Sequence, residues 1–146
     1  MWGGNIIINR APMYEVTLWP LLAAGIANLI IGFIWYHPSV FGTKWMRLAN
    51  ISPESMEAGK KKMPIIGFFA VLAAIVMAYV MAHFGIAWGV FDVIGAVELA
   101  FWLWVGFVVP TSLGVVLWEG KSVTLFFINA GYWLVSMIVA AVILVL

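Results

Sequence analysis

The sequence has 146 residues, of which 66% are hydrophobic and 9% are charged, and its formal net charge is +1. Soluble globular domains carry about 25% charged residues, so this apolar excess excludes a soluble protein and indicates a single-domain integral membrane protein. The sequence shows no basic face with interleaved aromatic residues, which excludes a nucleic-acid partner. It has no cysteine, which excludes disulfides and cysteine metal sites.

The first fifteen residues, MWGGNIIINRAPMYE, contain neither a basic leading region nor a cleavage site of small residues. We therefore expect no removable signal peptide. Residues 5–9 form a short apolar tail, which we expect either to lie at the membrane interface or to cap a partner.

Four segments are long and apolar enough to cross a bilayer, which takes ~20 residues at a helical rise of 1.5 Å per residue. Pro64 suits the first turn of the second span, and the polar loop before it carries a helix-start signal at Ser52. Short links between the last three spans predict antiparallel neighbours. The fold class is therefore all-α, a polytopic membrane protein with four transmembrane helices in an up-and-down bundle and a single membrane domain, 1–146. The predicted helices cover residues 16–36, 64–86, 92–117 and 122–146, with a cytoplasmic loop at 37–63.

The Lys and Arg residues near the span ends lie almost all on one side. The two loops of that side hold Lys44, Arg47, Lys60, Lys61, Lys62 and Lys121. The opposite side has only Arg10. The positive-inside rule therefore predicts that both loops are cytoplasmic and both termini outside, in the cytoplasmic or plasma membrane of a prokaryote. The Lys60 to Lys62 run is a candidate contact for anionic lipid.

The first span ends in an aromatic segment, FIWYHPSVFGTKW at residues 33–45. Pro38 is expected to push the preceding residue out of helical geometry and so to end the helix. Aromatic rings favour the boundary between water and hydrocarbon. The segment either anchors the helix at the interface or also contacts a lipid headgroup or ligand. The residues of this candidate motif are Trp35, Tyr36, His37, Pro38, Lys44 and Trp45.

Four polar residues are expected near the outer surface, where the second and third spans meet. They are Tyr79, His83, Asp92 and Glu98. Glu98 lies six residues beyond Asp92, ~9 Å along a helix, and is the only charge well inside any span. The set either binds a cation or relays protons, or it consists of residues that face the headgroups while Glu98 bonds Tyr79 to secure the hairpin.

A second polar layer is expected in the inner half of the membrane, where counting residues from the loops places polar side chains at one depth. They are Asn28, Thr111, Ser112 and Asn129, and Tyr132 lies on the same stripe of the fourth span as Asn129. Pro110 is expected to kink the third span and to free the carbonyl of Gly106, which amides or hydroxyls would satisfy. The layer is either a set of interhelical hydrogen bonds, worth ~0.6–2 kcal/mol each, or a broken-helix site for an ion or substrate.

Small residues recur every four positions in two spans and predict close helix packing. They are Ala70, Ala74, Ala78 and Ala82 in the second span, and Ala24, Asn28 and Gly32 in the first. Four helices offer few internal faces, so we expect some of these columns to contact another copy of the chain in a homo-oligomer.

Two stretches carry a family resemblance: residues 32–45, GFIWYHPSVFGTKW, and residues 104–135, WVGFVVPTSLGVVLWEGKSVTLFFINAGYWLV. They resemble the small four-helix membrane family catalogued as domain of unknown function 1761. The matching residues are Trp35, Tyr36, Pro38, Phe41, Gly42, Trp45, Trp104, Gly106, Phe107, Glu119, Gly120, Lys121, Asn129, Gly131 and Tyr132. The resemblance implies a topology and no settled activity. It also implies that Glu119, Lys121, Asn129 and Tyr132 matter to the fold or the site.

Two functions follow from these patterns. One is a small oligomeric channel or transporter for an ion or small solute, with a buried Glu98 on its path. The other is a structural or accessory membrane subunit whose polar groups only join helices. We expect no enzyme, no cofactor and no metal, because the sequence offers no nucleophile and base pair, no metal-binding His motif and no phosphate-binding glycine loop.

Overall fold

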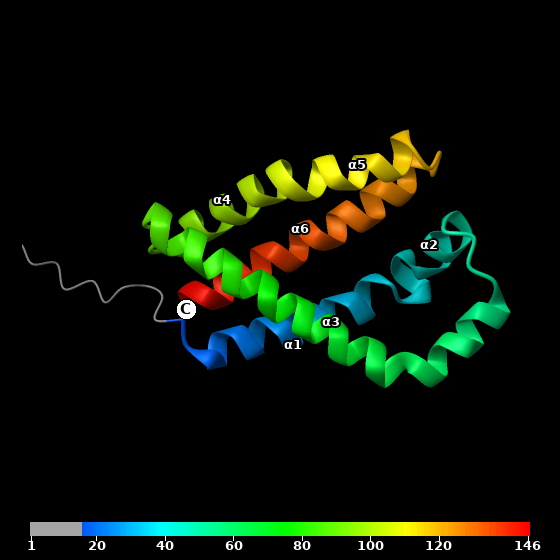
Figure 1. Cartoon of the computed structure of the whole chain (residues 1–146), viewed down its shortest axis with the longest axis horizontal. Coiled ribbons are helices and arrows are strands. Elements are labelled where there is room, and N and C mark those ends of the chain that lie inside the picture. Colours follow the sequence, from blue (N-terminus) through cyan, green and yellow to red (C-terminus); the bar gives the residue numbers. More distant parts are fainter. Residues whose placement is uncertain (1–15) are drawn as a thin grey trace, which may run out of the picture.

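The computed structural model describes residues 16–146, which form an all-α bundle with four candidate membrane spans (Figure 1). The predicted apolar tail at residues 5–9 and the charge at Arg10 lie outside the described residues. The elements are α1 (Leu18–Trp35), the π-helical turn η1 (Pro38–Gly42), α2 (Thr43–Leu48), α3 (Pro53–Trp88), α4 (Val93–Leu103), the π-helical turn η2 (Trp104–Val108), α5 (Val109–Leu117) and α6 (Val123–Val145).

The four spans run between two ends of the bundle. One end, here called the hairpin end, carries the turn between α3 and α4 together with the chain's last residue and the start of α1 (Figure 1). The other, the loop end, carries α2 and the turn between α5 and α6. The candidate spans are Leu18–Trp35, Pro53–Trp88, Val93–Leu117 and Val123–Val145.

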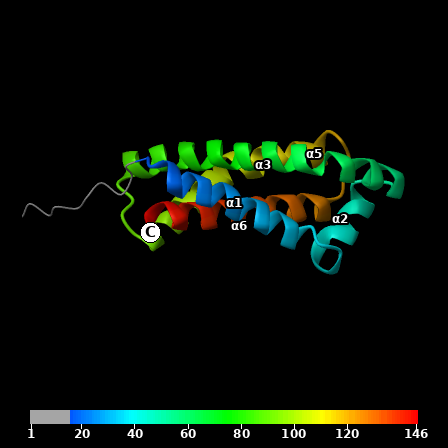
Figure 2. The same cartoon turned by 90° about the horizontal axis from the view of Figure 1, so that it is seen from below.

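Helix α1 packs against both α3 and α6, and α6 packs in turn against α4 and α5. Figure 2 shows α3 as a layer lying over α1 and α6. Helices α3 and α4 approach each other near their turn, and α3 diverges from α5 toward the loop end (Figure 1). Helix α3 therefore follows α1, and a groove remains between α3 and α5.

Small residues explain why α3 follows α1. Ala24 on α1 and Ala74 and Ala78 on α3 are all at most 2% exposed. A Cβ atom added to Gly25 would lie 2.8 Å from Cγ1 of Ile75, so the two helices are already in close contact. These small residues therefore pack between two helices of the same chain, whereas Ala70 is exposed.

The second span begins earlier than predicted. Ser52 caps α3 by accepting a hydrogen bond from the backbone N–H of Ser55 at 3.2 Å, as its helix-start signal indicated. The helix then continues without a break through Pro64, which lies in its interior and not in its first turn. Proline removes one helical hydrogen bond. The residues around it, 60–66, are exposed, which suits water or headgroups satisfying the freed carbonyl.

The third span has the irregularity that Pro110 predicts. The π-helical turn η2 directly precedes α5, and Pro110 lies in the first turn of α5. The hydroxyl of Thr111 donates to the carbonyl oxygens of Phe107 at 2.5 Å and Val108 at 3.1 Å. These carbonyls lie four and three residues before Thr111, and neither is the Gly106 carbonyl that we expected a hydroxyl or amide to satisfy. The wider π turn before Pro110 accommodates the proline ring.

Gly42 lies in the connection between α1 and α2, and substituting it tests how closely that connection is packed. A Cβ atom there would collide with the carbonyl oxygen of Tyr36 and would lie 2.8 Å from the Tyr36 carbonyl carbon. We expect Gly42→Ala to reduce the free energy of unfolding by about 1–3 kcal/mol, the usual effect of overpacking. Denaturant unfolding in bicelles would measure it.

Gly59→Ala is the matched control, because a Cβ atom at Gly59 meets nothing within 4 Å. It should leave the stability unchanged or raise it slightly, since Ala is the better helix former. Equal losses for the two variants would contradict the steric explanation.

Candidate functional site

The loop end of the bundle converges on a short stretch of α6. Trp35 at the end of α1 donates its indole N–H to the carbonyl oxygen of Ile128 at 3.0 Å. Trp104 in η2 donates in the same way to the carbonyl oxygen of Ala130 at 2.7 Å. Gly131 makes the first approach possible, because a Cβ atom there would lie 3.2 Å from Cζ2 of Trp35. Two tryptophans from different elements thus bond to the α6 backbone.

Asn129 lies between these two carbonyls and accepts two further hydrogen bonds. Its Oδ1 receives the phenol O–H of Tyr36 and the indole N–H of Trp45, both at 3.1 Å. An indole nitrogen can only donate, so the atom that faces Trp45 must be the amide oxygen. Burial, reinforced by the neighbouring Tyr132, raises the pKa of Tyr36 to about 12, which keeps its phenol protonated and donating.

A second asparagine bonds α1 to α6 farther into the span. The phenol of Tyr132 donates to Oδ1 of Asn28 at 2.8 Å, and Asn28 is 4% exposed. The ring of Tyr36 lies 5.3 Å from that of Tyr132 and 5.1 Å from that of Trp45, measured between centroids. These hydrogen-bonded residues form what we call the Asn129 cluster: Asn28, Trp35, Tyr36, Trp45, Asn129 and Tyr132.

The aromatic motif after α1 therefore divides into two parts. Trp35, Tyr36 and Trp45 are half-buried and bonded to α6, so their main contacts lie within the chain and were not anticipated. His37 and the proline after it shape the turn, since His37 has an extended backbone and its Nδ1 accepts from the backbone N–H of Ser39. Pro38 accepts a hydrogen bond from Thr43, and Lys44 is exposed.

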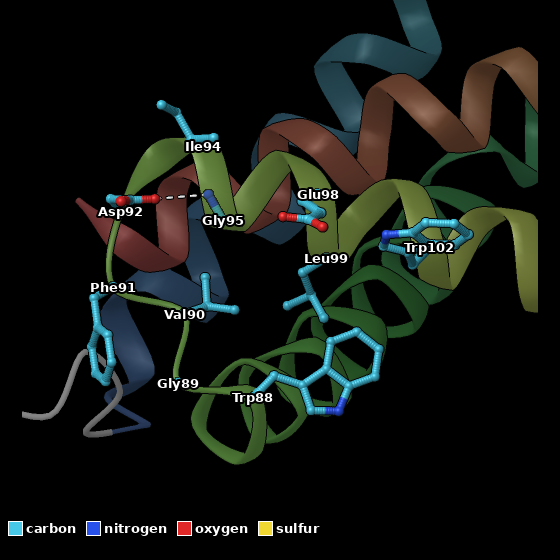
Figure 3. Close-up of a pocket in the computed structure, with 10 residues that line it drawn as sticks. All are labelled: Trp88, Gly89, Val90, Phe91, Asp92, Ile94, Gly95, Glu98, Leu99 and Trp102. Atoms are coloured by element: carbon cyan, nitrogen blue, oxygen red, sulfur yellow. Dashed lines mark hydrogen bonds between the residues drawn. The ribbon is translucent and has the colours of Figure 1, made fainter.

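The hairpin end contains a cavity of about 620 Å³, here called the hairpin cavity. It is lined by Trp88, Gly89, Val90, Phe91, Asp92, Ile94, Gly95, Glu98, Leu99 and Trp102 (Figure 3). Asp92 caps α4 by accepting a hydrogen bond from the backbone N–H of Gly95 at 2.7 Å. Glu98 is exposed, so the prediction that it is buried is wrong for the single chain.

The expected cluster of Tyr79 and His83 with the two acids does not form. His83 donates from Nδ1 to the carbonyl oxygen of Tyr79, on the same helix, at 2.8 Å, and both side chains are exposed. Neither lines the hairpin cavity. Met81 and Gly85 are buried and lie two residues on either side of His83. Since two residues correspond to about 200° around a helix, His83 faces the opposite way.

Two further spaces lie between the hairpin cavity and the loop end. A central groove of about 560 Å³ opens between α3, α5 and α6 and is lined by Val76, Met77, Val80, Met81, Phe84, Leu103, Phe107, Val108, Thr111, Ser112, Trp133 and Met137. A loop-end cavity of about 320 Å³ is lined by Tyr36, Ser112, Val115, Phe126, Asn129, Tyr132 and Trp133. Asn28 lines neither, so the two predicted polar layers do not form one polar path.

Trp104 and Trp133 were not among the predicted site residues. Trp104 was noted only as part of the family pattern, yet its indole bonds α6. The sequence signal for Trp104 and Trp133 is in α6, where Asn129, Gly131 and Tyr132 lie within about one turn of each other. Glycine beside a polar residue in a span indicates a close approach by a neighbour. Which neighbour approaches depends on the tertiary fold.

Four apolar spans with interhelical polar contacts define a polytopic membrane protein. The chain belongs to the family described as Protein of unknown function (DUF1761), whose model matches residues 19–145. No curated protein and no solved structure matches the chain. Of the turn residues that the resemblance singled out, Glu119 is exposed, and Lys121 donates its backbone N–H to the carbonyl oxygen of Val115 at 3.3 Å.

A double-mutant cycle tests the Asn129 cluster. Asn129→Ala removes the acceptor of two donors, so we expect it to lower the free energy of unfolding by about 2–4 kcal/mol. Tyr36→Phe alone should lower it by about 1 kcal/mol and should have almost no effect in the N129A background. The coupling is measured by unfolding in bicelles.

Tyr132→Phe is the control for this cycle. Its phenol bonds Asn28 and not Asn129, so its effect should be the same in both backgrounds. An unchanged effect of Tyr36→Phe in the N129A background would contradict the assigned hydrogen bond.

Proposed function

We propose that the chain forms a small oligomeric channel or transporter for a cation or small cationic solute, with Glu98 on its path. The observation that carries this proposal is the position of Glu98. Its carboxylate is exposed on a membrane-spanning helix, ~9 Å beyond the cap residue Asp92, and it lines the hairpin cavity (Figure 3). The single ion pair within residues 16–146 joins Lys60 to Glu57. No basic side chain of this part of the chain therefore forms an ion pair with Glu98.

An ionised side chain is unfavourable against lipid, by up to about 2.5–3.5 kcal/mol at the centre of a bilayer. The residues around Glu98 on α4 are nevertheless exposed and apolar, among them Val97, Phe101 and Trp102. A face of this kind fits a contact between copies that encloses water beside the carboxylate. Carboxylates next to tryptophan rings favour a cation, through charge and through the π face.

Reconstitution into liposomes tests the proposal. We expect the protein to conduct at least one of four probes, H⁺, Na⁺, K⁺ or tetraphenylphosphonium, above the rate of empty liposomes. Glu98→Gln should reduce that rate at least tenfold and leave the oligomer's mass in native mass spectrometry unchanged. Glu57→Gln is the control, since this exposed acid lies in the first turns of α3 and its surface ion pair contributes little.

The alternative is a structural or accessory subunit without transport activity. The Asn129 cluster favours it, because the amide oxygens and phenols of that layer bond across helices. In that case no probe moves faster than in empty liposomes, and Glu98→Gln changes the mass of the assembly and not a flux. Both proposals describe a non-enzymatic protein. The spans themselves contact the bilayer, and we also propose that Lys60, Lys61 and Lys62, which are exposed, contact anionic lipid.

A further inference from the structure

The loop-end cavity contains hydrogen-bond donors that the chain does not use. Oδ1 of Asn129 accepts from Tyr36 and Trp45, so the amide NH₂ must face away from both. Within residues 16–146 neither this NH₂ nor the hydroxyl of Ser112 has a hydrogen-bond partner. Both residues line the cavity. A ligand there would therefore present an acceptor oxygen.

The walls of the same cavity describe the shape and charge of that ligand. Four of the lining side chains are aromatic: Tyr36, Phe126, Tyr132 and Trp133. Aromatic walls with a few placed polar groups are typical of small-molecule sites, and flat rings stack well against them. None of the described residues that line the cavity is charged. A charged group would lack a counter-ion here, so the ligand's head is neutral and planar.

The central groove continues the cavity toward the hairpin end. The two spaces share Ser112 and Trp133. Apart from Thr111 and Ser112 on α5, the groove is lined by apolar side chains of α3, α4, η2 and α6. It has room for a hydrocarbon chain, which enters from the bilayer at little cost because lipid tails and apolar side chains are equally apolar surroundings. A head in the cavity and a chain in the groove can therefore belong to one molecule.

We propose that the loop-end cavity and the central groove together bind a lipid-soluble quinone. One carbonyl oxygen of the head accepts hydrogen bonds from Nδ2 of Asn129 and from the hydroxyl of Ser112, and the hydrocarbon chain lies in the groove between α3 and α5. The site is independent of the proposed transport, because it does not include Glu98. It is a binding site only, and no electron transfer is part of the proposal.

Binding of decylubiquinone to the purified full-length chain in nanodiscs tests this site, with empty nanodiscs as the background. We expect saturable binding by isothermal titration calorimetry. Asn129→Asp keeps an oxygen for Tyr36 and Trp45 but removes the NH₂, and should weaken binding at least tenfold. Ser112→Ala should weaken it about 3- to 10-fold, the effect of one neutral hydrogen bond.

Val115→Trp provides a variant that fills the cavity without removing any hydrogen bond, and should abolish binding. Val135→Trp is its matched control: the residue is exposed on α6 and lines neither space, so binding should persist. Melting temperatures show which variants remain folded. Glu98→Gln should bind as the wild type does, which separates this site from the transport proposal.

Two results would overturn the proposal. One is the absence of saturable decylubiquinone binding to the wild-type chain, or binding that Val115→Trp leaves unchanged. The other is a phospholipid that native mass spectrometry finds on the wild-type chain but not on Val115→Trp, and that decylubiquinone does not displace. In that second case the occupant is a membrane lipid.

Discussion

The packing of the loop end depends on one constraint, that the indole N–H and phenol O–H groups of aromatic side chains are stabilised in apolar surroundings when they reach acceptors within the protein. Three tryptophans and two tyrosines near this end find theirs on α6 and α1. The backbone of α6 can serve as an acceptor because Ala130 and Gly131 leave room for the indoles of Trp104 and Trp35. Asn129, the residue before them, adds a side-chain oxygen that accepts from α2 and from the end of α1. One turn of α6 thus joins three other elements, α1, α2 and η2.

This arrangement also accounts for the groove. Helix α1 is held to α6 by the Asn129 cluster and to α3 by small residues, among them Gly25 and Ala78. Helix α3 therefore follows α1, while η2 is held to the other side of α6 by Trp104. Helix α3 and the η2–α5 segment separate toward the loop end, as Figure 1 shows. Apart from Thr111 and Ser112, the space between them is lined by apolar side chains. The groove is a consequence of which helix each donor reaches.

Much of the fold could be predicted because its signals are local. Apolar length predicts four spans, Ser52 predicts the start of α3, and Pro38 predicts the extended backbone of His37. The errors arose where a residue has two allowed positions. Pro64 is accepted in a helix's first turn and also in its interior, where polar surroundings can satisfy one carbonyl. His83 and Glu98 were placed by height alone, but which side of a helix faces its neighbour depends on the residues that pack it. These are Met81 and Gly85 on α3, and Leu99 and Ala100 on α4. Likewise, aromatic residues at a span end suit an interface or an interhelical hydrogen bond equally well, and only the position of α6 decides between them.

The polar side chains at the two ends of the bundle differ in charge and in whether they join helices. At the loop end the polar side chains of the Asn129 cluster are neutral, and their hydrogen bonds join helices. At the hairpin end the polar groups are charged, and Asp92 is explained by its capping bond to α4. Glu98 has no such bond among the described residues, and its removal leaves no interhelical donor unsatisfied. A carboxylate that does not stabilise its own helix, on a face of exposed apolar side chains, has to be stabilised by water, a cation or a second copy of the chain. All three lie outside the single chain, which is why the role of Glu98 has to be sought in an assembly and not in the bundle's packing.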